Sequence, residues 1–321
     1  MPNLLITRHL PEGSLDAAVK AGVDIVARPD DTAYTTAELA GAAGTVDAIV
    51  SLVTDRIDAG VLTAGKGRLK VVANVAVGYD NIDVPAATEA GVVVCNTPGL
   101  NEETTADIAF GLILAAARRF SEAEADLRAG RWQGWEIGQY LGYDLHGATL
   151  GLVGYGGIGR AVGRRARGFS MEVLHHTRTP TGEPGWTADL HEMLARSDMV
   201  SLHVPLTTLT HHLIGRPEFA VMKPTALLVN TSRGPVVDEE ALAEALEEGR
   251  IFAAGIDVYE REPQVHPRLL AAPRAVLLPH VGSGSVATRL AMAAMAVRSA
   301  VSVLAGEVPG NALNPEAARP S

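Results

Sequence analysis

Three glycines, Gly154, Gly156 and Gly159, directly follow the short apolar segment 150–153 and precede a segment of helical periodicity. This order predicts a strand, a tight turn and a helix whose first turn lies close to the strand end. The N-terminus of such a helix offers N–H groups and a positive dipole end to a phosphate. The residues assigned to a dinucleotide pyrophosphate are Gly154, Gly156, Gly157, Ile158 and Gly159. The alternative is a tight turn in a domain that binds no ligand.

Short apolar segments alternate with helical segments along the chain, which predicts βα units and parallel sheets. The first series of predicted strands comprises residues 4–7, 24–27, 48–53, 71–73 and 92–95. The second series comprises residues 148–153, 172–174, 199–203, 227–230, 253–257 and 276–278. Between the two series, residues 103–130 have the pattern of one long helix, which we expect to end at Gly130.

Two series in 321 residues predict two α/β domains, because one hydrophobic core rarely serves a chain of this length. Hydrophobic residues make up 47% of the chain but aromatic residues only 4%, which predicts a core of Ala, Val, Leu and Ile. Residues 286–305 predict a long helix that returns to the first domain, so that domain is expected to be discontinuous in sequence.

The charge and cysteine content narrow the class of protein. The formal net charge of −10 is spread along the chain, which argues against nucleic acid or anionic membranes as partners and favours a small-molecule substrate. Cys95 is the only cysteine, which suits a reducing cytoplasm. No leader pattern and no uninterrupted apolar stretch of about 18 residues occurs, so we expect neither export nor membrane insertion. No metal ion is expected.

The sequence after the predicted strand 172–174 bears on the choice of cofactor. Residues 175–179 read His-His-Thr-Arg-Thr, where an NAD-binding fold usually has an acid that binds the adenosine ribose. Arg178 and the hydroxyls of Thr177 and Thr179 are suited instead to a 2′-phosphate. We therefore predict a preference for NADP(H), with NAD(H) use left open; the alternative is a solvated surface turn.

Three ionisable residues, Arg233, Glu262 and His280, lie at the ends of predicted strands of the second series, where parallel sheets place their ligands. The guanidinium of Arg233 can hold a carboxylate or keto oxygen. The imidazole of His280 is suited to donate a proton when a ketone becomes an alcohol. Glu262 can hold that imidazole through one nitrogen and favour its protonated form. For each residue considered alone, the alternative to a catalytic role is a structural one: Arg233 as a surface arginine and His280 as a structural histidine.

Seven further stretches occur in order over nearly the full length of the chain. They are VAVGYDNID, NTPGLNEETTADIAFGLIL, GATLGLVGYGGIG, HVPLTTLTHHLI, LLVNTSRGPVVDEEALAEAL, AAGIDVYEREP and LPHVGS. With these stretches the chain resembles the D-isomer-specific 2-hydroxyacid dehydrogenase family. The resemblance implies a flavodoxin-like substrate domain from residues 1–98 and 287–321, and a Rossmann cofactor domain with dimerisation helices from residues 99–286. It also implies a keto acid bound in a cleft between the domains.

The resemblance implies a role for each candidate residue. Arg233 binds and polarises the keto group, His280 is the general acid and base, and Glu262 supports His280. The backbone N–H groups of Val77 and Gly78 hold the substrate carboxylate. Further residues that the resemblance assigns to the cofactor are Thr105, Val204, Pro205, Thr210, Thr231, Ser232, Asp257, His280 and Gly282.

Within that family, the chain resembles the glyoxylate/hydroxypyruvate reductase branch. The similarity rests on residues 177–179, on Ser283, and on Trp132 and Trp135 before the cofactor domain. Ser283 and Trp135 are candidate substrate contacts. Residues 106–120 correspond to a segment that forms the dimer interface in relatives, which implies a homodimer in which Trp135 reaches the partner's pocket. A tryptophan that covers the helix junction is the alternative.

Some features depart from the family pattern or leave its substrate open. Gly284 and Ser285 replace a common Ala-Thr pair, but Ser285 keeps a hydroxyl that can cap the following helix. No extension for an effector domain follows residue 315, which makes a serine-biosynthetic dehydrogenase less expected. Enzymes acting on phosphoglycerate, lactate, phenylpyruvate, formate or phosphite remain alternatives. A non-catalytic NAD(H)-sensing protein is the alternative from another class.

Overall fold

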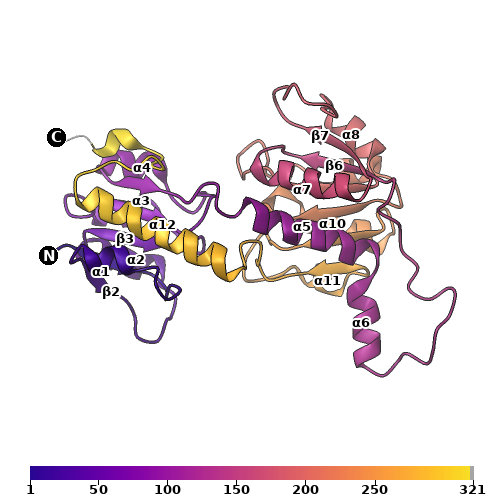
Figure 1. The fold of residues 1–321 in the computed structure, drawn as a ribbon, viewed down its shortest axis with the longest axis horizontal. Coiled ribbons are helices and arrows are strands. Elements are labelled where there is room, and N and C mark those ends of the chain that lie inside the picture. Colours follow the sequence, from indigo (N-terminus) through magenta and orange to yellow (C-terminus); the bar gives the residue numbers. More distant parts are fainter. Residues whose placement is uncertain (319–321) are drawn as a thin grey trace. The chain divides into compact units, whose positions relative to one another are not determined.

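The computed structural model describes residues 1–318 and divides into two compact units (Figure 1). Unit 1 comprises residues 1–101 and the chain from residue 284 onward, and unit 2 comprises residues 102–283. The chain thus changes unit at residues 101 and 283, whereas the sequence-based division was at 98 and 286. Every strand expected from the apolar segments is present, and both sheets are parallel, so the α/β fold class is confirmed.

The sheet of unit 1 has the strand order β2-β1-β3-β4-β5, which is flavodoxin-like. Its strands are β1 (Asn3–Ile6), β2 (Asp24–Val26), β3 (Ala48–Ser51), β4 (Val71–Asn74) and β5 (Val93–Cys95). Helices α2 (Thr36–Ala43), α3 (Ala59–Ala64) and α4 (Val84–Ala90) contribute to one core, and α1 (Asp16–Lys20) and α12 (Val286–Leu304) to the other. Successive residues of β1 serve opposite cores, Leu5 the first and Leu4 and Ile6 the second, as the pleat of a strand requires.

Helix α12 completes unit 1 from the C-terminal part of the chain, as the sequence predicts. Ser285 is its N-cap and accepts a hydrogen bond from the N–H of Thr288 at 3.2 Å. By length and a mean hydropathy of 1.3, α12 would suffice to cross a membrane. However, Ala296, Val297 and Ala300 pack against the sheet of unit 1, so one side of α12 belongs to the core of that unit. The short 3₁₀ helix η2 (Pro315–Ala318) ends the described chain.

The sheet of unit 2 has the strand order β11-β10-β9-β8-β6-β7. Its strands are β6 (Thr149–Val153), β7 (Glu172–His176), β8 (Met199–Leu202), β9 (Leu227–Asn230), β10 (Ala253–Ile256) and β11 (Ala275–Leu277). Helices α5 (Glu102–Ala117) and α7 (Gly157–Gly168) share one core, and the other core includes α8 (Leu190–Arg196), α9 (Arg216–Val221), α10 (Glu239–Glu247) and α11 (Pro267–Ala271). Because β6 lies between β7 and β8, its carboxyl end is a topological switch point, where such folds bind ligands.

The expectation of one helix over residues 103–130 is wrong. The segment forms α5 and a separate α6 (Phe120–Arg128), which Figure 1 shows running in another direction. The N–H of Tyr143 binds the carbonyl of Ala117 at 3.0 Å, and Arg119 turns the chain with a left-handed φ of 54°. The helix is therefore broken at Arg119, and a later loop binds the carbonyl that the break leaves free. Gly130 follows α6 with a φ of 69°, as expected for a helix end.

Candidate functional site

The glycine loop between β6 and α7 has the close packing that the sequence predicts. Gly154 has a left-handed φ of 91°, and a Cβ there would collide with the backbone of His203. A Cβ at Gly159 would collide with the carbonyl of Gly154, so α7 approaches the end of β6 too closely for any side chain. Beside Gly156, in contrast, a Cβ would meet no atom within 4 Å. The loop thus leaves open space before the N-terminus of α7, as a pyrophosphate requires.

The side chain of Glu102, at the start of α5, lies against this loop and was not considered in the sequence analysis. Its carboxylate occupies the place that a Cβ on Gly157 would take. The positive end of α7 attracts this carboxylate as it would attract a phosphate. A bound phosphate would be repelled by the like charge of Glu102.

In the loop after β7, the residues predicted to bind the adenosine end of the cofactor differ in their contacts. The hydroxyl of Thr177 donates to the carbonyl of Thr179 at 2.7 Å and accepts from Nε1 of Trp186 at 3.1 Å, so it holds the loop together. Arg178 is exposed, and its guanidinium has no hydrogen bond or ion pair within the described residues. Arg178 is therefore the cation of this loop that remains available to an anion.

His175 is a structural residue of β7. Its ring stacks on Tyr155 with centroids 3.9 Å apart, and its Nε2 lies 2.7 Å from the hydroxyl oxygen of Thr181. Burial, with the charges of Arg160 and Arg167, lowers the pKa of His175. The neutral ring fixes the glycine loop against β7.

Arg233 follows β9 in a turn that Asn230 organises. The buried Asn230 side chain donates to the carbonyl of Arg233 at 2.9 Å and accepts from the N–H of Ser232 at 3.0 Å. The next residue, Gly234, lies against the backbone of Tyr259, and a Cβ there would collide with it. The arginine turn is therefore packed directly against the loop that carries Glu262.

His280 and Glu262 form the pair that the sequence predicts. Nδ1 of His280 lies 2.8 Å from Oε2 of Glu262, and the other carboxylate oxygen accepts from the N–H of Tyr259 at 3.0 Å. Burial raises the pKa of Glu262, but the hydrogen bond and charge of His280, the Tyr259 N–H and the charge of Arg233 outweigh it, so this pKa lies below its ordinary value. An ionised carboxylate thus holds the imidazole by Nδ1, and this contact does not use Nε2.

Asp257, at the end of β10, fixes the loop of His280. Its carboxylate accepts from the N–H groups of Val281 at 2.7 Å and Gly282 at 2.8 Å, and its carbonyl accepts from the N–H of His280 at 2.9 Å. His280 itself has a left-handed φ of 52°. The buried Asp257, predicted beside the cofactor, therefore acts on the chain's own backbone.

Two other predicted cofactor residues have buried polar atoms without a partner. The hydroxyls of Thr105 and Thr231 are buried and make no hydrogen bond. The same holds for Nε2 of His203, a residue that the sequence analysis missed, and burial lowers its pKa to about 3. Unsatisfied buried polar atoms are costly, so the hydroxyls of Thr105 and Thr231 fit a bound group that supplies partners.

The remaining predicted residues lie in both units. Thr210 donates to the carbonyl of Pro205 at 2.7 Å and thereby closes the turn that follows Val204. Trp135 is 78% exposed on the segment after α6, and Ser283 is half-buried at the end of unit 2. Val77 and Gly78 belong to unit 1 and follow β4.

Comparisons with known proteins agree with this fold. Residues 110–282 match the family described as D-isomer specific 2-hydroxyacid dehydrogenase, NAD binding domain. The glyoxylate reductase of Thermococcus litoralis is 44% identical over 98% of this chain and 97% of its own length. A solved structure of a Thermus thermophilus protein is 44% identical, has a TM-score of 0.91, and is matched over 97% of this chain and 99% of that one.

A further solved structure contains a cofactor. It is an NADPH-dependent glyoxylate/hydroxypyruvate reductase from Sinorhizobium meliloti in complex with NADP and malonate, 34% identical with a TM-score of 0.86. The match covers 100% of this chain and 99% of that one. The chain described here belongs to the D-isomer-specific 2-hydroxyacid dehydrogenase family, in its glyoxylate reductase branch, and is an oxidoreductase with an NAD-binding domain.

Proposed function

We propose that this protein reduces a small 2-keto acid of the glyoxylate or hydroxypyruvate class to the D-2-hydroxy acid, with NADP(H) as the favoured cofactor. The observation that carries the proposal is the 2.8 Å contact between Nδ1 of His280 and Glu262. It fixes the imidazole through Nδ1 beside the ionised Glu262, so Nε2 is the ring nitrogen proposed to donate the proton.

Arg233 and His280 have different roles toward the keto group. The guanidinium of Arg233 binds the keto oxygen and stabilises the negative charge that develops on it. Nε2 of His280 donates a proton to that oxygen, and Glu262 stabilises the imidazolium before this transfer. A nicotinamide, when bound, supplies the hydride that goes to C2 of the keto acid. The balance is one keto acid, one reduced cofactor and one proton converted to one hydroxy acid and one oxidised cofactor.

The residues of unit 2 fit such a cofactor. Gly154, Gly156 and Gly159 provide the close backbone approach at the N-terminus of α7, and the unpartnered hydroxyls of Thr105 and Thr231 offer polar contacts. Arg178 supports the NADP(H) preference, because it is an exposed guanidinium at the position where NAD-specific folds carry an acid. The Sinorhizobium relative that is NADPH-dependent supports the same preference.

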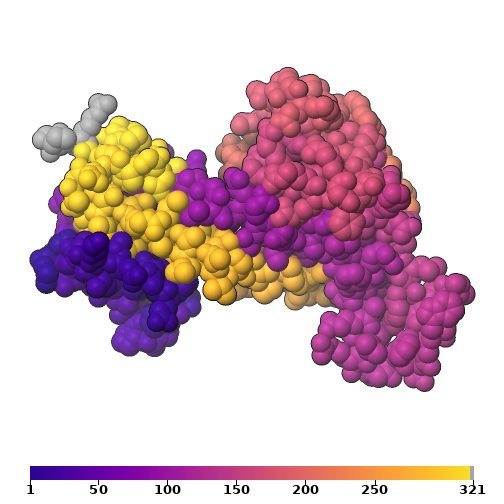
Figure 2. Space-filling view, in the orientation of Figure 1, coloured from indigo at the N-terminus to yellow at the C-terminus, as the bar shows by residue number. Residues whose placement is uncertain are grey.

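We further infer a cytoplasmic homodimer. The segment that contains α6 projects from the rest of unit 2 (Figure 2) and exposes large apolar side chains. These are Phe120, Leu127, Trp132, Trp135, Ile137 and Leu141, all at least half exposed. Apolar side chains gathered in this way favour burial against a second copy of the chain. In that dimer, Trp135 is the residue proposed to reach the partner's substrate.

A panel assay tests the proposed function. Glyoxylate, hydroxypyruvate, pyruvate and phenylpyruvate are each supplied with NADH and with NADPH, and the absorbance of the reduced nicotinamide is followed. We expect the highest kcat/KM for glyoxylate or hydroxypyruvate with NADPH. His280→Ala should lower kcat by orders of magnitude with cofactor binding retained. Absence of turnover on every keto acid, with the cofactor bound, would contradict the proposal and identify a sensing protein.

A further inference from the structure

Three successive carbonyl groups after β4 are bound by donors from the interior of unit 1. The carbonyl of Ala76 accepts from the N–H of Thr97 at 2.9 Å. The carbonyl of Val77 accepts from Nδ2 of Asn96 at 2.8 Å, and that of Gly78 from Nδ2 of Asn74 at 3.1 Å. In an extended strand, successive carbonyls alternate in direction. Three carbonyls in a row with interior donors therefore indicate a turn and not a strand.

The direction of the carbonyls determines the direction of the following N–H groups. In a trans peptide, the C=O of one residue and the N–H of the next point opposite ways, and the bonds of this turn are trans. The N–H groups of Val77, Gly78 and Tyr79 therefore all point away from the buried Asn74 and Asn96. Within the described residues, none of these three N–H groups has a hydrogen-bond acceptor. Consecutive N–H groups on one side of a turn can form a concave site for an anion.

The two asparagines whose side chains bind the carbonyls of Gly78 and Val77 are themselves held in place. Oδ1 of Asn74 accepts from the hydroxyl of Ser51 at 3.1 Å, and its Nδ2 also donates to Oδ1 of Asn81 at 3.0 Å. Asn96 is fixed through its backbone, because Nδ2 of Asn311 donates to its carbonyl at 2.6 Å. Asn74 is completely buried and Asn96 is 7% exposed, so neither side chain has room to turn.

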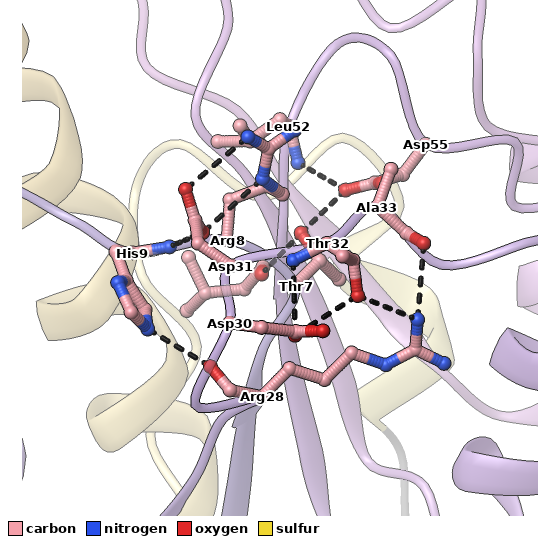
Figure 3. A network of polar contacts seen from close by, with 11 residues as sticks. Thr7, Arg8, His9, Arg28, Asp30, Asp31, Thr32, Ala33, Leu52 and Asp55 are labelled. Carbon is pink, nitrogen blue, oxygen red and sulfur yellow. Dashed lines mark hydrogen bonds and ion pairs between the residues drawn. The ribbon is translucent and has the colours of Figure 1, made fainter.

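A second polar network supports Asn81 from the neighbouring strand end. Nδ2 of Asn81 donates to the carbonyls of Leu52 at 3.1 Å and Asp55 at 2.9 Å. The carboxylate of Asp55 in turn accepts from the Leu52 N–H at 2.7 Å and from the Thr7 hydroxyl at 2.5 Å (Figure 3). The ends of β1, β3 and β4 are therefore linked into one rigid support for residues 76–79.

We propose that Asn96 and Asn74 are positioning residues that aim the N–H groups of Gly78 and Tyr79 at the carboxylate of the substrate. The N–H of Val77 completes the site, and the N–H of Thr97 binds the carbonyl that precedes it. This inference rests on the proposed function and adds two elements to it. Tyr79 supplies a third N–H donor besides those of Val77 and Gly78, and the buried amides of Asn74 and Asn96 prevent the peptide planes from turning. A carboxylate has two oxygens with about four lone-pair directions, which suits three donors on one side of a turn.

The first experiment observes the three N–H groups directly. Backbone amide NMR signals of the full-length protein are followed with NADP⁺ or NAD⁺ present while oxamate, an unreactive analogue of a 2-keto acid, is added. The signals of Val77, Gly78 and Tyr79 should shift together and saturate with one dissociation constant. If none of the three signals shifts while oxamate inhibits turnover, the inference is overturned.

The second experiment removes the donor that holds Val77. Asn96→Asp keeps the shape but replaces the N–H donor by an oxygen that repels the carbonyl. We expect the KM for glyoxylate to rise about tenfold or more, since hydrogen bonds to a charged group are lost, with a smaller change in kcat and unchanged cofactor binding. If the Asn96→Asp variant does not fold, Asn96→Ala, which also lacks the N–H donor, is measured in its place.

Asn314→Asp is the matched control for this variant. Asn314 is 1% exposed, belongs to unit 1 and also binds backbone groups, those of Val92 and Val94. Its replacement should lower the melting temperature without changing the KM for glyoxylate. Equal KM values for the Asn96 variant and the wild type would overturn the positioning role, as would equal KM increases in the Asn96 and Asn314 variants.

The third experiment tests the added donor. Tyr79→Pro removes the N–H group, whereas Tyr79→Ala removes the side chain and keeps the N–H group. The proline variant should raise the KM for glyoxylate about tenfold relative to the alanine variant. Equal KM values in two folded variants would remove Tyr79 from the site. If the wild type reduces no keto acid but oxamate shifts the three signals, the proposed function fails and the anion site stands.

Discussion

Replacing Glu262 by Gln removes the charge behind His280 and preserves the shape of the side chain. The wild-type contact is 2.8 Å, and the two side chains are only 31% and 28% exposed, so solvent screens the pair incompletely. Hydrogen bonds to charged groups contribute about 1.5–3 kcal/mol and neutral ones about 0.5–1.5 kcal/mol. The expected loss is about 1–2 kcal/mol, which corresponds to about a 5- to 30-fold decrease in kcat/KM for keto-acid reduction.

The same substitution has a pH signature. The pKa of Glu262 is lowered in the folded protein, so its stabilising contribution is present above the ordinary carboxyl pKa and is lost as pH falls through the lower, folded pKa. The difference in unfolding free energy between wild type and Glu262→Gln should therefore shrink at acidic pH.

The assay compares kcat/KM from acid to alkaline pH with saturating cofactor, alongside denaturant unfolding. Glu218→Gln is the matched control, because Glu218 makes a 2.9 Å contact with His191 away from the candidate site. A Glu262→Gln variant that keeps kcat/KM within about twofold of wild type at every pH, as the control should, would refute the assigned role of the pair.

Three further predictions concern the cofactor and the fold. Arg178→Ala should lower the ratio of kcat/KM for NADPH to that for NADH about tenfold or more, because a charge-assisted contact to the 2′-phosphate is lost; an unchanged ratio would exclude Arg178 from cofactor choice. Glu102→Gln should tighten cofactor binding about three- to tenfold in a fluorescence titration at low salt, by removing a like charge from the N-terminus of α7. Weaker binding would show that Glu102 assists the cofactor. Ser285→Ala should destabilise unit 1 by about 1 kcal/mol through loss of the α12 cap, and an unchanged unfolding midpoint would contradict this.

The positions of the strands could be predicted from the sequence because the signal for a buried parallel strand is local. Each is a short apolar segment bounded by loop residues, and each appears within a few residues of its predicted place. The helix break at Arg119 could not be predicted in this way. Helical residues continue across it, and the N–H that binds the carbonyl of Ala117 comes from Tyr143, in a loop with no periodic pattern.

A similar difference exists between the reactive residues of the site and the residues that hold them in place. Arg233 and His280 each follow a predicted strand, and their side chains suggest their own chemistry. The side chain of Asn230 binds backbone groups of its own turn, and the N–H of Tyr259 binds the carboxylate of Glu262. The side chain of Asp257 binds backbone groups of the loop after β11, so its task depends on which strands are adjacent. The stretch containing Asn230 is part of the family resemblance, but the sequence did not indicate a separate role for this asparagine.

The anion site of unit 1 shows why backbone groups are hardest to assign from sequence. A sequence names side chains, whereas the proposed donors at Val77, Gly78 and Tyr79 are N–H groups that almost every residue has. What distinguishes them is that interior donors bind the preceding carbonyls, namely the N–H of Thr97 and the side chains of Asn96 and Asn74, from the ends of two neighbouring strands. Buried asparagines at the ends of adjacent parallel strands are therefore candidates for supporting a site made of backbone N–H groups, because their amides fix the direction of peptide groups.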